Sequence, residues 1–206
     1  MSELELKKEL EECRKKLKEH YYKGLLFDFL IRRYRDYIET NEAKTIQDLK
    51  RMIDASNETV KKVADEVIRS IPDYSSEKVK EGVEAALKLI SERIYSVPSL
   101  GINFWMTPEE VYEARVADYE DKAIFFCSVL KAMGLNASVL IAELSDGTNA
   151  PFVVVRNAKV FLVDPNNNLL FEAESFPEVV KKYEFNGVRI TSLLYEFDDL
   201  KYEEYS

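Results

Sequence analysis

Histidine, tryptophan, glutamine and cysteine are scarce in this 206-residue sequence, which has one His, one Trp, one Gln and two Cys. Cys13 and Cys127 lie far apart, with no CxxC spacing and no neighbouring histidine. This pattern indicates neither a disulfide framework nor a zinc site, and we expect no metal and no cofactor. The scarcity of thermolabile side chains, together with abundant Lys, Glu and Arg, is a weak compositional indication of a thermophilic source.

Positively charged residues are also fewer than negatively charged ones, with 29 Lys and Arg against 38 Asp and Glu. The formal net charge is −9 and the pI is near 4.9. Nucleic acids and anionic membranes both favour basic surfaces, so we expect neither as a partner. The longest apolar runs, such as AIFFCSVL, are too short to cross a bilayer, and the sequence is charged from its third residue. We therefore expect an acidic, cytoplasmic protein.

The first half of the sequence, residues 1–98, shows helical patterns and no convincing strand. Apolar positions recur every three or four residues from Leu6 to Ile38, which predicts a long first helix over 1–40. Two interpretations stay open: a coiled-coil arm that forms a homo-oligomer through this 6–38 seam, or a helix laid across its own domain. The second is favoured because His20 and Gly24 are poor coiled-coil residues at seam positions.

Further helix boundaries can be located from capping residues. A helical segment over 46–71 has a break near Asn57, and another runs from Ser76 to Val97. Thr107 followed by Pro108 is a strong helix start. Asp118 can cap a nearly all-apolar helix that begins at Tyr119 and is closed by Gly134.

The second half of the sequence changes to strand patterns after residue 136. Alternating or continuous apolar runs of strand length predict a mostly antiparallel sheet. These strands are expected at 137–144, 152–155, 159–164, 168–173 and 188–197, with a short helix near 177–183. Helices followed by strands are typical of an α+β fold. We expect a helical region over 1–98 and an α+β core over 99–206, in which a buried helix packs on the sheet.

Three segments carry a resemblance to a known family: WMTPEEVYEARVADYEDKAIFFCSVLKAMG, APFVVV and FLVDPNNN. Together they resemble the transglutaminase-like branch of the papain-like cysteine peptidases, over about residues 104–170. In that family a cysteine opens a buried helix, a histidine on a strand takes its proton, and an aspartate on the next strand orients the histidine. The resemblance implies amide cleavage or exchange through a thioester.

The triad positions of this sequence depart from the family pattern. Tyr119 stands where the resemblance places the nucleophilic cysteine, and Ala150 where it places the histidine; a shift of one residue gives Asn149 or Pro151 instead. Only Asp164 matches its family counterpart. Because a tyrosine hydroxyl has a pKa of about 10, it supplies little nucleophile at neutral pH without a strong base beside it. The resemblance therefore implies a vestigial triad of Tyr119, Ala150 and Asp164.

Other residues near these positions have two interpretations each. Trp105, Asp118 and Phe152 are candidates to line the ancestral cleft, which large aromatic side chains either fill or leave open as a platform for a peptide. Cys127 could be a relocated nucleophile, but its place on the core face of its helix favours an inert thiol. Acidic residues at 118, 120, 121 and 164 could bind calcium, although no calcium-loop motif is present and cap or dipole roles are favoured.

These observations favour a catalytically inactive transglutaminase-like protein, a pseudoenzyme, that acts as a protein or peptide interaction module or as a structural module. The alternative is a hydrolase or amide-acyltransferase with an unorthodox site near Tyr119 and Asp164. The identity of a partner cannot be inferred from these residues.

Overall fold

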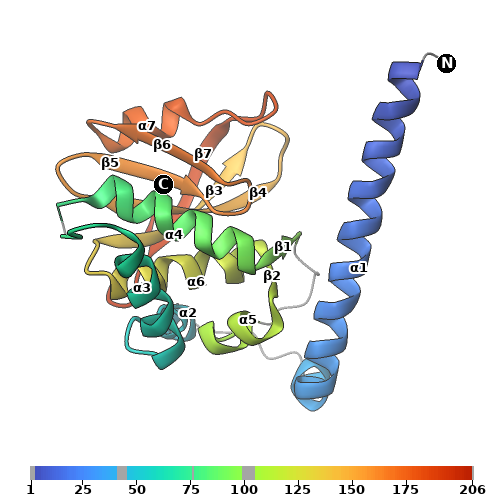
Figure 1. Ribbon diagram of the computed structural model, residues 1–206, viewed down its shortest axis with the longest axis horizontal. Coiled ribbons are helices and arrows are strands. Elements are labelled where there is room, and N and C mark those ends of the chain that lie inside the picture. Colours follow the sequence, from blue (N-terminus) through green and yellow to red (C-terminus); the bar gives the residue numbers. More distant parts are fainter. Residues whose placement is uncertain (1–2, 41–45, 76, 99–104, 206) are drawn as a thin grey trace.

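The structure is a computed structural model that describes residues 3–40, 46–75, 77–98 and 105–205. Within this part of the chain the fold is α+β, as expected, with a helical N-terminal part and a six-stranded antiparallel sheet. No helix among the described residues is long and apolar enough to span a membrane. Figure 1 shows a compact body of sheet and helices, with the first helix beside it.

The first helix, α1 (Glu3–Thr40), is long, as predicted, and has one non-helical residue, Tyr34, with φ −133°. Its N-terminal half extends away from the body (Figure 1). Leu26 and Leu30 are buried against the protein's own core, so α1 does lie on its own domain. However, the apolar seam of the sequence is not the face that packs there, since Leu6, Leu17 and Ile31 are exposed. The side chain of Ile38 lies outside the described residues.

Three shorter helices follow: α2 (Ile46–Met52), α3 (Glu58–Ser70) and α4 (Val79–Arg93). The predicted break between α2 and α3 is confirmed. Asn57 caps α3, and its side-chain oxygen accepts hydrogen bonds from the backbone N–H groups of Thr59 at 2.9 Å and Val60 at 3.3 Å. Ser76, the expected cap of the following helix, lies outside the described residues.

The expectation of no strand before residue 98 was wrong. Strand β1 (Tyr95–Val97) pairs in parallel with β2 (Val116–Asp118). Each strand has only three residues, too few to show an alternating pattern. Helix α5 (Pro108–Ala114) lies between them in the sequence. Its predicted start is confirmed as a capping box, in which Thr107 and Glu110 each accept a hydrogen bond from the other's backbone N–H.

The buried helix α6 (Tyr119–Ala132) begins after its cap Asp118, as predicted, and Gly134 follows it with φ 84°. The remaining elements end the chain in the expected order. They are β3 (Ala137–Leu144), β4 (Asn149–Arg156), β5 (Val160–Asp164), β6 (Leu169–Ala173), α7 (Phe176–Lys182), β7 (Ile190–Phe197) and β8 (Tyr202–Glu204). Strand β8 was not predicted, because the acidic tail resembles a solvated end.

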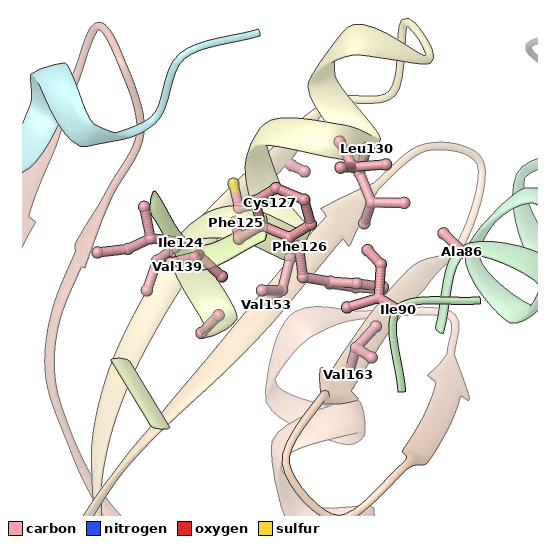
Figure 2. Close-up of a cluster of buried hydrophobic side chains, with 14 of the residues drawn as sticks. Ala86, Ile90, Ile124, Phe125, Phe126, Cys127, Leu130, Val139, Val153 and Val163 are labelled. Carbon is pink, nitrogen blue, oxygen red and sulfur yellow. The ribbon is translucent and has the colours of Figure 1, made fainter. Parts of the chain in front are cut away.

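The sheet has the strand order β6-β5-β4-β3-β7-β8, and all its pairs are antiparallel. Alternate residues of each strand point to opposite faces. One face packs on α6, and Figure 2 shows Phe126 of α6 close to Val153 of β4, with Ile90 of α4 nearby. The other face packs on α7 in a second cluster that includes Phe152 and Tyr183. The sheet is therefore buried on both sides.

One cluster of buried side chains joins the two halves of the chain. It includes Leu26 of α1, Val63 of α3 and Val83 of α4, together with Phe126 and Val139 from the second half. The expected boundary at residues 98 and 99 adjoins residues 99–104, which lie outside the described part of the chain.

Candidate functional site

Tyr119 is the first residue of α6, at the end of the helix that attracts negative charge. The carboxylate of Asp118, directly before it, accepts a hydrogen bond from the backbone N–H of Asp121 at 2.9 Å. Burial raises the pKa of Asp118, although the N–H groups of Asp121 and Glu120 oppose the shift. Asp118 therefore acts as a buried helix cap, and α6 holds Tyr119 in a fixed place.

The side chain of Tyr119 is partly buried. Burial raises the pKa of its hydroxyl, and the nearby Glu19, Asp164 and Tyr95 raise it further. Within the described part of the chain the hydroxyl makes no hydrogen bond. A phenol in this environment stays protonated at neutral pH, so it is a weak nucleophile.

Ala150 lies on β4, where it pairs with Ala142 of β3. The β4–β5 pairing joins Val153 to Val163, and extending this register places Phe152 opposite Asp164. Ala150 lies two residues further along β4, on the same face of the sheet as Asp164. The position that the resemblance gives to a histidine thus lies on the sheet face that carries Asp164, but it holds a methyl group that cannot accept a proton.

Asp164 ends β5, and only 3% of its surface is exposed. Its Oδ1 accepts hydrogen bonds from the backbone N–H groups of Asn166 and Asn167, both at 3.1 Å. Its Oδ2 accepts from the side-chain amide of Asn167 at 2.8 Å and from the hydroxyl of Tyr183 at 3.0 Å. Two oxygens of a carboxylate offer about four acceptor directions. Three donors from the turn that follows Asp164, together with the hydroxyl of Tyr183, therefore use the acceptor capacity of its carboxylate.

Tyr183 is the donor that sequence reasoning missed. It follows α7 directly and is 2% exposed, and its ring packs edge-to-face on Phe152 at a centroid distance of 4.8 Å. Phe152, a candidate for the cleft, is itself fully buried in this cluster. A buried tyrosine needs a hydrogen-bond partner for its hydroxyl, and here that partner is Asp164. The residue could be found only from the fold, because 19 positions separate the two side chains in the sequence.

Lys122 is a second residue that the sequence did not single out. It lies one turn into α6 from Tyr119 and is only 3% exposed. Its amine donates one long hydrogen bond, 3.5 Å, to the hydroxyl of Ser96 in β1. Burial lowers the pKa of Lys122 to about 8, and the charge of Asp164 opposes this shift. Its position in a buried helix, and not its sequence context, gives it this property.

The acidic residues of the first turn of α6 have separate roles. Asp121 accepts a hydrogen bond from the backbone N–H of Met106 at 2.9 Å, which ties the segment beside Trp105 to α6. Trp105 is partly buried against the main core. Burial and the charge of Asp118 raise the pKa of Glu120 to about 7. Among the described residues, no group of three or more His, Cys, Asp and Glu side chains is placed to hold a metal ion.

The structure also places Cys127, the alternative nucleophile, and His20, the one histidine of the sequence. Cys127 is fully buried, and burial raises the pKa of its thiol far above the usual range. A thiol of this kind is inert toward most substrates. His20 is exposed on α1.

Helix α1 packs next to the start of α6. The ring of Tyr22 stacks on Tyr95 of β1 at a centroid distance of 4.0 Å, and the amine of Lys18 lies 4.8 Å from the centre of the same ring. At its far end, Arg33 of α1 bonds to Glu113 at 2.8 Å. The middle of α1 is therefore anchored on β1, whose partner strand β2 leads directly into Tyr119.

A groove with a volume of about 500 Å³ lies between α4 and the start of β6, together with the residue that precedes β6. Its lining includes Leu87 and Ser91 of α4 with Asn168 and Leu170, but none of Tyr119, Ala150 and Asp164. This groove is thus separate from the triad positions.

Comparisons with known proteins agree with this geometry. Residues 103–185, about two fifths of the chain, match the model of the CEP76 peptidase-like domain. A search of the curated proteins gave no match.

Solved structures give the same result for the fold. LapG of Legionella pneumophila is 13% identical over 79% of this chain and 88% of its own, with a TM-score of 0.51. Its calcium-bound form is 15% identical over 71% of this chain and 86% of its own, with a TM-score of 0.52. These proteins have transglutaminase-like, papain-like peptidase folds, and the predicted resemblance is confirmed at that level. At such low identity the likeness concerns the fold and not the activity.

Proposed function

We propose that this chain is a transglutaminase-like protein that does not cleave amides and that acts as a structural module or as a module that binds protein or peptide partners. The observation that carries the proposal is the state of Asp164. Its carboxylate accepts four hydrogen bonds from Asn166, Asn167 and Tyr183. A carboxylate that orients a catalytic base needs at least one oxygen directed at that base. Here both oxygens accept hydrogen bonds from the turn after β5 or from the tyrosine that follows α7.

The nucleophile position supports the same proposal. The phenol of Tyr119 has a raised pKa and no hydrogen bond to a base within the described residues. Ala150 cannot act as a base, and the thiol of Cys127 is buried in the core. An acyl-transfer reaction needs both an activated nucleophile and a group that takes its proton. The properties of Tyr119, Ala150 and Cys127 suit neither role, which supports the proposal.

An interaction role is supported by α1. The N-terminal half of this helix carries Leu6, Leu10 and Leu17, which are between 50% and 72% exposed. Apolar side chains that lie on one face of a helix and face solvent are typical of surfaces that bind another protein. We take this face as the principal interaction surface of the module.

Amide cleavage is tested with the full chain and two variants, Tyr119→Phe and Lys122→Met. Each protein, at about 50 µM, is incubated with fluorescent casein and with a mixture of peptide nitroanilides, and product release is followed for a day. We expect no release above that of heat-denatured protein for any of the three. Release by the natural chain that is lost in Tyr119→Phe, with an unchanged circular dichroism spectrum, would show an active site near Tyr119 and overturn the proposal.

The interaction role is tested separately, by affinity capture from a cell extract. Proteins enriched on the natural chain are compared with those enriched on a variant carrying Leu10→Glu and Leu17→Glu. We expect at least one protein, either a different protein or a further copy of the chain itself, to be retained by the natural chain and lost from the variant. Identical capture by both proteins would refute a role for the exposed face of α1.

A further inference from the structure

Helix α1 has two apolar faces with different surroundings. One face packs on the body of the protein, where Leu26 is 1% exposed, Leu30 is 3% exposed and Tyr22 stacks on Tyr95. The other face, which we call the α1 seam, consists of Leu6, Leu10, Cys13, Leu17, Phe27 and Ile31. The apolar side chains of the seam other than Cys13 are 38–72% exposed, and Cys13 is exposed as well.

The two faces point in different directions. At 100° per residue, the α1 seam lies on average about 130° around the helix from Leu26 and Leu30. The body of the protein therefore leaves the whole seam accessible. The seam extends from Leu6 to Ile31, a length of about 38 Å, with His20 and Gly24 at the two positions between Leu17 and Phe27. The helical geometry is interrupted only after it, at Tyr34.

The seam positions alternate in steps of four and three residues. This is the heptad spacing at which two helices pack knobs-into-holes, with Leu10, Leu17 and Ile31 at one core position and Leu6, Cys13 and Phe27 at the other. We propose that the α1 seam binds the α1 seam of a second copy of this chain, in a parallel two-stranded coiled coil. This inference rests on the proposed interaction role of α1, for which it names the partner, and it does not depend on whether the chain cleaves amides.

The geometry of α1 leaves the seam accessible to a second helix. Because the docked face is turned about 130° away from the seam, two paired α1 helices carry their bodies on the flanks of the pair and not between the helices. The contacts of α1 with the body that are described above lie between Lys18 and Arg33, and the N-terminal half of the helix extends away from the body (Figure 1). The coiled coil thus adds contacts along the part of α1 that extends outward.

Charges beside the seam favour the parallel orientation. In a parallel pair, Glu9 lies across from Arg14 of the second copy, five residues further along, and the symmetric contact repeats this attraction. In a fully overlapping antiparallel pair, Lys16 would instead lie near Lys23 of the second copy, which is repulsive. His20 and Gly24 weaken the middle of the seam, so we expect the dissociation constant of the dimer to lie in the micromolar range.

The oligomeric state is measured with the full chain at 5 µM and 100 µM by light scattering coupled to size-exclusion chromatography. We expect the mass to rise from 23.9 kDa toward twice this value at the higher concentration. A variant with Leu10→Glu and Leu17→Glu should stay at the monomer mass at both concentrations. A natural chain that remains monomeric at 100 µM would overturn the proposal.

The matched control is Leu25→Glu, which changes a leucine of α1 that is 43% exposed but lies off the seam. It should dimerise like the natural chain. If Leu25→Glu also abolishes dimerisation, or if the Leu10→Glu and Leu17→Glu variant still dimerises, the contact is not through the seam. Circular dichroism of each variant shows that the body is folded.

Disulfide cross-linking through Cys13 tests whether the two paired α1 helices are parallel. In the parallel pair the two Cys13 side chains face each other across the seam, within reach of a disulfide. Diamide takes up two electrons and two protons as it oxidises the two thiols, and we expect a covalent dimer on a non-reducing gel. Cys13→Ser should give none, since Cys127 is buried. A dimer by mass that does not cross-link through Cys13 would overturn the parallel arrangement. The amide-cleavage assay is unaffected by either result, so the two proposals can fail independently.

Discussion

The hydroxyl of Tyr183 donates a hydrogen bond of 3.0 Å to Oδ2 of Asp164. This contact joins the residue that follows α7 to the last residue of β5. Both residues are buried, at 2% and 3% exposure. Burial, together with the charge of Asp164, raises the pKa of the Tyr183 hydroxyl, so the hydroxyl remains a donor throughout the physiological range. The aspartate of the family motif is thus retained as a structural acceptor.

Tyr183→Phe removes this donor and keeps the ring that packs on Phe152. A hydrogen bond to a charged group contributes about 2 kcal/mol, so we expect the free energy of unfolding to fall by about that amount. Urea denaturation followed by circular dichroism measures it. Tyr202→Phe is the matched control, because the hydroxyl of Tyr202 bonds to exposed Glu204. Equal effects of the two variants would contradict the structural role of the Tyr183–Asp164 contact.

Lys122→Met tests the buried amine. The folded state lowers the pKa of Lys122 to about 8 from an ordinary value of 10.5, so between these pH values the unfolded chain binds more protons. Stability should therefore rise with pH in this window, by about 2 kcal/mol from pH 8 to pH 9.5. The Lys122→Met variant should lack this rise, as measured by urea denaturation at each pH. The control Lys61→Met, on the exposed side of α3, should keep it; an unchanged slope in Lys122→Met would show that the amine is not desolvated.

Much of the fold follows from short-range signals. Thr107 with Pro108, Asp118, and Gly134 are residues whose local chemistry starts or ends a helix, and the helices begin and end there. The strand at 137–144 was predicted with its observed bounds because its sequence, ASVLIAEL, is a mostly apolar run of strand length. The parallel pair β1–β2 was missed, since it depends on contacts between residues about 20 positions apart.

The candidate site was predicted less completely than the fold. Tyr119, Ala150 and Asp164 could be assigned from motif spacing, but their neighbours could not. Lys122 appears in the sequence as an ordinary polar residue in the first turn of a helix, and only the fold, which places it beside Ser96 of β1, removes it from water. Tyr183 likewise reaches Asp164 only because α7 covers the sheet face that carries Phe152.

Thr107→Ala removes the cap of α5. The hydroxyl of Thr107 accepts a hydrogen bond from the backbone N–H of Glu110, and the side-chain carboxylate of Glu110 accepts one of 2.8 Å from the backbone N–H of Thr107. Loss of such a cap costs about 1 kcal/mol, and we expect a corresponding decrease in the melting temperature. Thr107→Ser keeps the hydroxyl and should melt close to the natural chain. Similar losses in both variants would point to the methyl group and not to the cap.

The burial of Cys127 predicts the reactivity of the thiols. In a Cys13→Ser variant, Ellman's reagent should modify no thiol in the native protein and one thiol per chain in 6 M guanidinium chloride, because the side chain of Cys127 is inaccessible and its pKa is raised. The absorbance of the released thiolate gives the count. Rapid modification of the native variant would revive Cys127 as a nucleophile.

The register of the short pair β1–β2 has a mechanical consequence. Tyr95, on which α1 stacks, is the first residue of β1, and Val97 at the other end of β1 pairs with Asp118, the residue before Tyr119. Only the three residues of β1 therefore separate the stacking contact of α1 from the first turn of α6. A force that pulls on α1 near Tyr22 reaches the cap of α6 through this short strand pair.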